Sequence, residues 1–483
     1  MRFSFIMFVG RRHELDLIRQ CLSDRAKAQL IVLYGRRRVG KSTLIRQSVS
    51  NETRVLYFEG IEGESTDVQI AQFLDDLALQ TGRVRLGART WREVFQGIGE
   101  LVVSGRWVLV FDEFPWMGAG RTSIVSQLKL YWDRWSSNPE VALFLCGSVA
   151  SFMVKHVIHS KALHNRKTLE LCLAPLPPWE AGLFVPKRSA REKAQLYMTL
   201  GGVPKYLEQI DPRRSIEQNL NRCCFTAGGF FINEYETLFK EQFRSSKVYE
   251  AVVAALAQAP ASLSELSRQT GVARGGGFLD QLQNLVRAQF VREYAPVSIG
   301  NARGRRTRVY KLADPFLGFY FRYIHHNRDL INSNTDGDNL FRSIVGPSLD
   351  QYYGFSFERL GEACMKRILQ AVGLSLTDVI RMGPYFRQAR VHGTGLQIDW
   401  LIMRRDGVWN PIEFKYSKNP TGMNAMHEMK EKIHRLNAPD DVTVEPILVS
   451  AKGTTAELDA SAFFQHVISL HDLMECGSEN RRP

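Results

Sequence analysis

Short apolar runs alternate with helix-like segments along the first part of the chain. The runs predict strands over residues 30–34, 54–58, 107–111 and 141–146. Strands that alternate with helices favour a mostly parallel sheet covered on both faces. We therefore expect an α/β domain that extends to about residue 211, followed by a helical lid or connector.

The pattern changes after residue 245. Apolar periodicity predicts helices over residues 248–257, 262–269 and 278–288, and strands over residues 290–296 and 306–312. Ser262 followed by Glu265 marks a helix start, and Gly271 marks its end. Three short helices followed by a β-hairpin favour a winged helix-turn-helix, whose third helix can enter the major groove of DNA. Such modules also bind proteins or cover ATPase sites, and that alternative stays open.

Near the end of the chain, apolar and charged residues alternate on two predicted strands that flank residues 405–407. Side chains alternate along a strand, so Glu413 and Lys415 share one face. If residues 405–407 form a three-residue hairpin loop with Gly407 in the left-handed region, Asp399 falls directly opposite Glu413. This register would gather two carboxylates and an ammonium group in one small volume.

Composition and charge narrow the class of protein. No apolar run reaches the roughly 18 residues needed to cross a bilayer, so we expect no membrane contact. Seven cysteines, scattered apart from Cys223-Cys224 and without a C-x-x-C pair, suit a reducing, cytoplasmic location. The formal charge of +13 favours a polyanionic partner, most simply double-stranded DNA, over a basic surface kept only for solubility.

Residues 35–42 fit the pattern G-x-x-x-x-G-K-[ST] of a phosphate-binding loop, with a predicted strand before it and a helix after it. Gly35 and Gly40 let backbone N–H groups turn toward phosphate oxygens, and the helix N-terminus adds a favourable dipole. Lys41 would contact the β- and γ-phosphates and Ser42 would bind Mg²⁺. The alternative is a glycine turn that contains Lys-Ser by chance. We expect ATP and Mg²⁺ as cofactors.

Two carboxylates, Asp112 and Glu113, follow the predicted strand over residues 107–111. Ligands bind at the carboxyl ends of strands in open α/β sheets. Asp112 is placed to hold the Mg²⁺ shell, and Glu113 to orient and activate the attacking water. A solvated turn or helix cap is the alternative for this pair.

Five motifs occur in order along the first domain: Phe8-Val9-Gly10-Arg11, the phosphate-binding loop, Phe111-Asp112-Glu113-Phe114, Leu145-Cys146-Gly147-Ser148 and Gly201-Gly202-Val203-Pro204-Lys205-Tyr206-Leu207. Together they resemble the prokaryotic AAA-like ATPase family described mainly from archaea and related to the STAND nucleotide switches. The resemblance implies that Ser148 is the polar sensor of the γ-phosphate. Arg134, Arg166 and Arg188 are conceivable arginine donors to a neighbouring subunit, which would require a homo-oligomer or a protein partner.

The spacing of Asp399, Glu413 and Lys415 is similar to that of the PD-(D/E)XK nuclease family, and the similarity extends to Glu358 on a predicted helix over residues 355–369. The resemblance implies an α/β/α restriction-endonuclease-like fold. Mg²⁺ or Mn²⁺ would bind at Glu358, Asp399 and Glu413. Lys415 would orient the nucleophile or stabilise the developing charge. An ordinary half-exposed hairpin, or a member of the family whose metal site has decayed, is the alternative.

The predicted organisation is a multidomain α/β protein. Its parts are a P-loop ATPase domain (1–211), a helical lid or connector (212–245), a winged helix (246–312), a connector (313–345) and a nuclease-like domain (346–483). The expected nucleotide-binding residues are Gly35, Gly40, Lys41, Ser42, Thr43, Asp112 and Ser148. Arginines of the wing, which would contact DNA phosphates, are Arg303, Arg305, Arg306 and Arg308.

These predictions define a function with one alternative. We expect an ATP-hydrolysing switch coupled to DNA binding and to metal-dependent DNA cleavage. In the alternative, the protein is a nucleotide-regulated DNA-binding or protein-interaction scaffold whose nuclease-like domain does not cut.

Overall fold

The computed structural model describes residues 8–49, 53–119, 123–148, 152–243, 246–299, 308–387 and 395–475. The chain forms two compact units, Met1–Pro175 with Arg287–Gln289, and Leu176–Val286 with Phe290–Pro483. Residues 176–211, which the sequence assigns to the first domain, therefore fold with the second unit.

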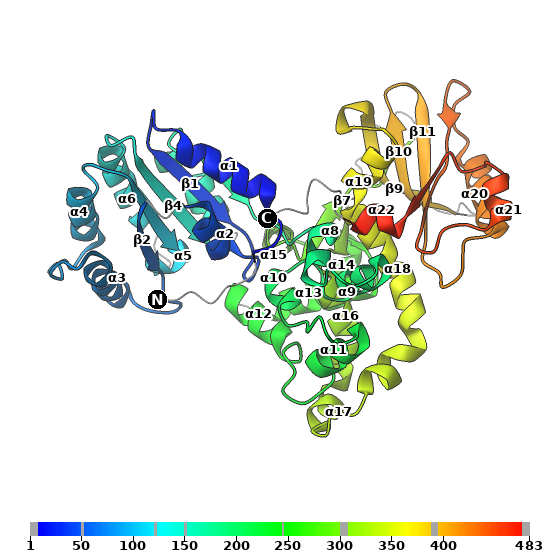
Figure 1. Ribbon diagram of the computed structural model, residues 1–483, viewed down its shortest axis with the longest axis horizontal. Coiled ribbons are helices and arrows are strands. Elements are labelled where there is room, and N and C mark those ends of the chain that lie inside the picture. Colours follow the sequence, from blue (N-terminus) through cyan, green and yellow to red (C-terminus); the bar gives the residue numbers. More distant parts are fainter. Residues whose placement is uncertain are drawn as a thin grey trace. The chain divides into compact units, whose positions relative to one another are not determined.

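The first unit is built on a five-stranded parallel sheet (Figure 1). The strands follow in the order β2 (Arg54–Glu59), β3 (Trp107–Asp112), β4 (Val141–Gly147), β1 (Gln29–Tyr34) and β5 (Leu169–Cys172). Strands β1 to β4 lie where the apolar runs predict them, and the expected parallel sheet is confirmed. Because β4 lies between β1 and β3, the carboxyl ends of these three strands share one edge of the sheet.

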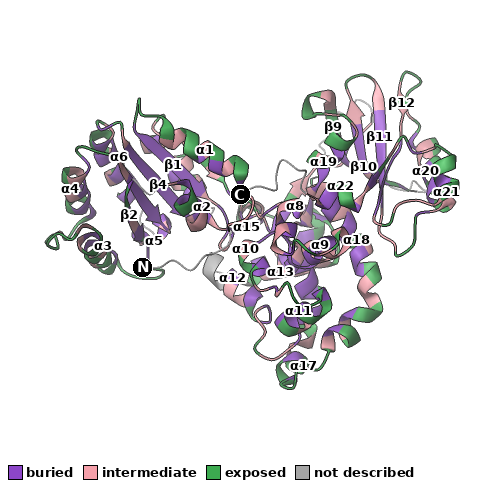
Figure 2. Ribbon diagram, viewed as in Figure 1, coloured by how far each residue is buried: buried purple, intermediate pink, exposed green. Residues whose placement is uncertain are grey.

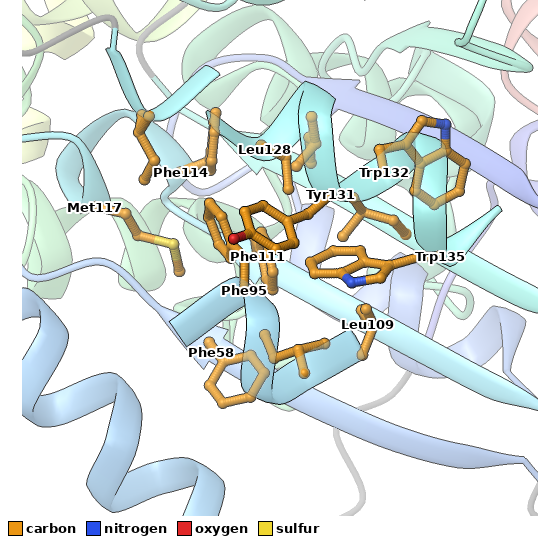
Figure 3. Close-up of a cluster of buried hydrophobic side chains, with 14 of the residues drawn as sticks. Phe58, Phe95, Leu109, Phe111, Phe114, Met117, Leu128, Tyr131, Trp132 and Trp135 are labelled. Carbon is orange, nitrogen blue, oxygen red and sulfur yellow. The ribbon is translucent and has the colours of Figure 1, made fainter. Parts of the chain in front are cut away.

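Helices cover both faces of this sheet. They are α1 (Arg12–Ser23), α2 (Lys41–Ser48), α3 (Thr66–Thr81), α4 (Trp91–Leu101), α5 (Phe114–Met117) and α6 (Ser123–Trp135). Alternate residues of each strand enter opposite cores: Val110 packs with residues of α1 and α2, whereas Phe111 packs with residues of α3, α4 and α6. Figure 2 shows the central strands β1, β3 and β4 as buried, and Figure 3 shows the core that contains Phe111, which is rich in aromatic side chains.

The second unit begins with short helices. They are α8 (Pro178–Ala181), α9 (Ala190–Leu200), α10 (Pro204–Leu207), α11 (Ile216–Cys224), α12 (Glu234–Gln242), α13 (Ser246–Gln258), α14 (Leu263–Thr270) and α15 (Gly276–Arg287). The last three confirm the predicted helices. Ser262 and Glu265 form the expected capping box at the start of α14, and Gly271 ends it at φ 69°.

A small antiparallel sheet follows these helices, in the order β6 (Ala261–Ser262), β8 (Val309–Leu312) and β7 (Val291–Tyr294). Strand β7 is shorter than the predicted strand over residues 290–296. The chain leaves this sheet after Tyr294, and the Val297 N–H donates to the Pro384 carbonyl at 2.9 Å. Pro384 lies on an edge strand of the C-terminal sheet. The Val297 side chain is buried in the core of that sheet, so this segment covers part of the edge strand.

Four α-helices lead to the last sheet: α16 (Pro315–Phe319), α17 (Arg328–Ser333), α18 (Leu349–Ala363) and α19 (Met365–Ala371). The prediction of a single helix over residues 355–369 is wrong, because Cys364 separates α18 from α19.

The last sheet has the order β14 (His466–Ser469), β13 (Ile447–Ser450), β11 (Val408–Lys415), β10 (Leu396–Arg404) and β9 (Val379–Arg387), and β12 (Thr443–Val444) pairs with β11. Strands β9, β10 and β11 are antiparallel neighbours, whereas β13 and β14 run parallel to β11. Helix α20 (Met423–Leu436) connects β11 to the parallel part, and α21 (Ala456–Ala460) and α22 (Leu470–Met474) complete the unit.

Helix α18 approaches β11 closely. A Cβ atom added at Gly361 would lie 2.1 Å from the Phe414 ring, so only glycine allows this contact. Phe414 therefore faces α18, and its neighbours Glu413 and Lys415 contact α20 on the other face. The predicted alternation along this strand is confirmed.

Within the part of the chain that the structure describes, no helix combines the length and apolar character needed to cross a membrane.

Candidate functional site

The phosphate-binding loop joins the end of β1 to the start of α2. Gly35 and Gly40 adopt φ angles of 154° and 90°, which favour glycine. A Cβ atom at Gly35 would lie 2.4 Å from the Leu173 carbonyl oxygen. Lys41 opens α2, and its buried ammonium donates to the Gly35 and Arg36 carbonyls at 3.2 Å each. The loop thus folds around the lysine, and Ser42 and Thr43 follow in the first turn of the helix.

Asp112 ends β3, and its buried carboxylate is held by three donors. Its Oδ2 atom accepts a hydrogen bond from Ser42 Oγ at 2.5 Å and another from the Tyr57 hydroxyl. Its Oδ1 atom accepts from the Glu113 N–H at 2.9 Å. The sheet order thus places the acidic end of β3 beside the first turn of α2.

Glu113 lies in the left-handed region at φ 46°, directly before α5. This conformation turns its carboxylate toward the end of β4, where Ser148 Oγ donates to it at 2.5 Å and the Ser148 N–H at 3.3 Å. The structure therefore brings Lys41, Ser42, Asp112, Glu113 and Ser148 to one edge of the sheet. Tyr57 was missed by the sequence analysis, because its proximity depends on β2 being the neighbour of β3.

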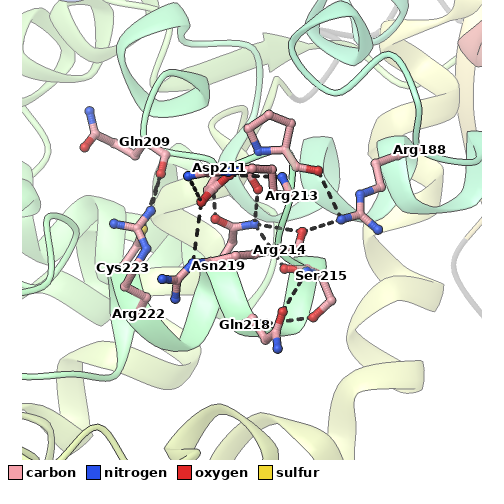
Figure 4. A network of polar contacts seen from close by, with 11 residues as sticks. Arg188, Gln209, Asp211, Arg213, Arg214, Ser215, Gln218, Asn219, Arg222 and Cys223 are labelled. Atoms are coloured by element: carbon pink, nitrogen blue, oxygen red, sulfur yellow. Dashed lines mark hydrogen bonds and ion pairs between the residues drawn. The ribbon is translucent and has the colours of Figure 1, made fainter.

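The three candidate arginine donors differ in their contacts. Arg166 makes two hydrogen bonds to Asp133, at 2.5 and 3.0 Å. Arg188 donates to the carbonyls of Pro212 and Arg214, within the polar network of Figure 4. Arg134 is exposed on α6, with its guanidinium 5.3 Å from the centre of the Tyr131 ring.

Strands β10 and β11 form the hairpin that carries the second group of candidate residues. Trp400 pairs with Ile412 and Met403 with Trp409, which is the register predicted from a three-residue loop. One step further along this register, Asp399 lies opposite Glu413, and Asp399 Oδ2 accepts a hydrogen bond from the Phe414 N–H at 3.1 Å.

Two lysines contact the buried Glu413 carboxylate. Lys415 Nζ lies 3.0 Å from one oxygen and Lys432 Nζ lies 2.5 Å from the other. Lys415 also pairs with Glu428 at 2.7 Å. The sequence analysis missed Glu428 and Lys432, although their spacing of four residues places them on one face of α20. Helix α20 thus contributes an acidic side chain, Glu428, and a basic side chain, Lys432, to the predicted site.

Glu358, on α18, is half-buried near these groups. Burial, together with the nearby Asp399 and Glu413 carboxylates, raises the pKa of Glu358 to about 7. Burial and Glu413 likewise raise the pKa of Asp399 to about 6. Ionisation of these carboxylates at neutral pH therefore costs free energy, which the positive charges of Lys415 and Lys432 offset in part.

A divalent cation would relieve the same repulsion. Mg²⁺ typically uses one or two protein carboxylates and keeps several waters, so the facing pair Asp399 and Glu413 fits such an ion. In the described segments, however, no cluster of three or more His, Cys, Asp or Glu side chains is arranged to hold a metal. The three-carboxylate set with Glu358 is thus not assembled in this arrangement, in which lysines contact Glu413.

These carboxylates give a testable pH dependence. Because the pKa of Glu358 is raised in the folded protein, the folded state binds more protons than the unfolded state between about pH 4.5 and 7. Stability is therefore highest below this range and falls as the pH rises through it. The rise from 4.5 to about 7 corresponds to about 3 kcal/mol.

We expect Glu358→Gln to remove most of this loss. In EDTA, melting of the variant should depend less on pH between 5 and 8 than melting of the unchanged protein, and the variant should be the more stable at pH 8. Asp406→Asn, at the exposed hairpin tip, is the matched control. Equal pH dependence in all three proteins would contradict the electrostatic strain inferred at Glu358.

The predicted DNA contacts are only partly within the described residues. Arg303, Arg305 and Arg306 lie outside them. Arg308 is exposed and pairs with Glu293 at 2.9 Å. On the third helix of this module, Gln283 also donates to Glu293, at 3.2 Å.

Comparison with known proteins supports the first site. Residues 8–210 match the model of a family described as an ATPase domain predominantly from Archaea. The region of the phosphate-binding loop is therefore similar to an archaeal ATPase domain, and this similarity supports the expected ATP binding. The match extends beyond residue 175, so the last part of this domain folds with the second compact unit.

Individual relatives are distant. An uncharacterised protein of Methanocaldococcus jannaschii is 27% identical over 360 residues, which cover 74% of this chain and 76% of that protein. A Walker-type ATPase of Pyrococcus abyssi is 19% identical, with a TM-score of 0.47, and the match covers 65% of this chain and 96% of that chain. The ORC2 protein of Aeropyrum pernix, solved in ADPNP and ADP complexes, is 14% identical with a TM-score of 0.43, over 69% of this chain and 97% of that chain.

Proposed function

We propose that the protein is a Mg²⁺-dependent ATP-hydrolysing switch that controls DNA cleavage by its C-terminal domain. The observation that supports hydrolysis best is the position of Glu113, whose half-buried carboxylate accepts a hydrogen bond from Ser148 at the edge of the sheet that carries the phosphate-binding loop. A carboxylate held there can orient a water molecule toward the γ-phosphate, and Ser148 links it to β4.

The residues of the loop have separate roles in this proposal. Lys41 would neutralise charge on the β- and γ-phosphates, and the backbone N–H groups of the loop would bind the phosphate oxygens. Ser42 and Asp112 lie 2.5 Å apart and offer a hydroxyl and a carboxylate, the oxygen ligands that Mg²⁺ prefers. Mg²⁺, when bound there, would supply charge stabilisation during phosphoryl transfer.

The C-terminal domain is proposed to cleave a phosphodiester. Its elements follow in the order helix, three antiparallel strands, helix and parallel strand, which agrees with the α/β/α nuclease-like fold expected from the sequence. Asp399 and Glu413 would bind Mg²⁺ or Mn²⁺. Lys415 would orient the nucleophile, and Lys432 would release Glu413 when a cation takes its place.

DNA binding is proposed for the module of residues 246–312, which has the three helices and the small sheet of a winged helix. Arg308, together with Arg303, Arg305 and Arg306, would contact phosphates. Contacts of this kind release counterions, so affinity would fall steeply with salt.

Helix α9 offers a route for the coupling. It belongs to the segment that matches the ATPase family, and it contacts the residues directly after Lys415. Arg191 donates to the Ser417 carbonyl at 2.8 Å and lies over the Tyr416 ring at 4.5 Å, while Gln195 donates to the Tyr416 hydroxyl at 3.0 Å. A shift of α9 on ATP binding would therefore reach β11 through direct contacts.

Lys41→Ala tests this coupling. We expect the unchanged protein to cut plasmid DNA in Mn²⁺ at a rate that differs with and without ATP, because the proposal takes ATP binding to shift α9. The variant should cut at one rate under both conditions. Measurement of nicked and linear DNA over time gives the rates, and an ATP response that survives in Lys41→Ala would contradict the gating.

A second candidate function is a nucleotide-regulated scaffold that binds DNA or protein without cutting. The observation that favours it is the pairing of Glu413 with both Lys415 and Lys432, since ammonium groups can replace a cation in a site that has lost its activity. DNA that stays intact in Mg²⁺ and in Mn²⁺, but is retained by the protein at low salt, would select this alternative.

A further inference from the structure

Tyr57 donates its hydroxyl hydrogen bond to Asp112 Oδ2, the same oxygen that accepts from Ser42. It lies on β2, two residues before Glu59, which pairs with Asp112 across the two strands. Tyr57 is half-buried, and its side chain is directed along the sheet face toward the end of β3. The tyrosine thus reaches the candidate Mg²⁺ ligand from a strand that contributes none of the predicted site residues.

Two further side chains, those of Gln80 and Arg46, hold this tyrosine in place. Strand β2 is an edge strand, so the backbone N–H and carbonyl of Tyr57 have no partner strand among the described residues. Both groups make hydrogen bonds with the Gln80 side chain instead. The Tyr57 N–H donates to the Gln80 amide oxygen at 2.8 Å, and the Gln80 amide nitrogen donates to the Tyr57 carbonyl at 2.7 Å. Arg46, from the helix that follows the phosphate-binding loop, lies 5.4 Å from the centre of the Tyr57 ring.

The two oxygens of Asp112 are therefore fixed by donors from different directions. The Glu113 N–H binds Oδ1, and the Tyr57 hydroxyl binds Oδ2. A carboxylate at a strand end can otherwise rotate, and a ligand group that is already oriented loses less conformational freedom when an ion binds. Ser42 is itself a candidate Mg²⁺ ligand, so its hydroxyl would turn toward the ion. The Tyr57 hydroxyl has no such role and can keep its hydrogen bond to Oδ2 when the ion binds.

We propose that Tyr57 is a positioning residue that orients Asp112 for Mg²⁺ and thereby sets the Mg²⁺ dependence of ATP binding. This inference rests on the proposed function, because it takes Asp112 as part of the Mg²⁺ site.

Tyr57→Phe removes the hydroxyl and keeps the ring under Arg46. With a fluorescent ATP analogue, we expect the Mg²⁺ concentration at half-maximal enhancement of binding to rise about tenfold, as for loss of one hydrogen bond to a charged group. Affinity for the analogue in EDTA should stay within about twofold, since the Tyr57 hydroxyl donates to Asp112, whereas Lys41 and the backbone N–H groups of the loop would bind the phosphates. A purely structural role would lower both affinities or the melting temperature.

Tyr131→Phe is the matched control, because Tyr131 lies in the aromatic core of the same unit (Figure 3) and should leave the Mg²⁺ midpoint unchanged. Gln80→Ala, at an exposed position, gives a second test if Tyr57→Phe does not fold, because it releases the backbone of Tyr57 without touching the site. It should shift the midpoint in the same direction.

An unchanged Mg²⁺ midpoint in the folded variant would overturn the role of Tyr57. If the unchanged protein itself bound the analogue equally well with and without Mg²⁺, the proposed Mg²⁺ site would fail, and the role of Tyr57 would fail with it. The two failures are distinguishable, because only the second is seen in the unchanged protein.

Discussion

Replacing Glu113 by glutamine is expected to lower the rate of ATP hydrolysis by about 10²–10⁴-fold, the usual contribution of a positioned general base. Glutamine has nearly the same shape and can still accept the hydrogen bonds that Ser148 donates to Glu113. The backbone N–H of residue 113, which binds Asp112, is also retained. The substitution thus removes the negative charge that activates water while leaving the donors around it in place.

Binding and hydrolysis should therefore separate in this variant. Phosphate release measures hydrolysis, and the affinity for a fluorescent ATP analogue in Mg²⁺ should stay close to that of the unchanged protein. Glu59→Gln is the matched control, since Glu59 pairs with Asp112 across the sheet and carries a pKa raised by burial and by Asp112 and Glu113. Hydrolysis by Glu113→Gln at the rate of the control would show that another group activates the water.

Local sequence signals were sufficient for the elements that carry these sites. The apolar runs before Gly35 and before Asp112 predict two buried strands, and both are present with their bounds extended by one residue. The register that places Asp399 opposite Glu413 follows from the length of one hairpin loop, because turn geometry fixes strand pairing over a short distance.

Contacts that depend on the order of strands could not be read in the same way. Tyr57 reaches Asp112 only because β2 is the neighbour of β3, and Lys432 reaches Glu413 only because α20 packs over β11. No spacing in the sequence distinguishes the parallel neighbours of a strand, since helices of variable length connect them.

The middle of the chain shows a different limit. Residues 290–296 have a strand pattern, but Val297 is buried in the core of the last sheet instead of continuing a hairpin. Similarly, α9 lies in the ATPase family match yet packs in the second unit, beside Tyr416. Burial alone predicts that a residue has a partner surface, and it does not predict which one.

The second large effect is expected at the C-terminal site. Asp399→Asn should lower Mg²⁺- or Mn²⁺-dependent cleavage of plasmid DNA by more than about 100-fold, because loss of a direct metal ligand should exceed the 10–100-fold cost of losing an outer-shell partner. Asparagine keeps an oxygen that can accept from the Phe414 N–H, so the hairpin should hold its register.

Asp406→Asn is again the control, because it neutralises a carboxylate in the same hairpin at an exposed position. ATP hydrolysis should be unchanged in both variants, which separates loss of the C-terminal site from loss of the first. Asp399 also has a pKa raised to about 6, so Asp399→Asn removes a buried charge and should not destabilise the domain at pH 8.

The measured cleavage decides which role the carboxylates at this hairpin have. Cleavage that is lost in Asp399→Asn and kept in Asp406→Asn would place the chemistry at Asp399 and Glu413. Cleavage that persists in Asp399→Asn would contradict the proposed site. If the unchanged protein binds DNA without cutting it, the role of this domain is binding. The raised pKa values of Asp399 and Glu358 would then reflect the free energy needed to keep neighbouring carboxylates charged beside Lys415 and Lys432.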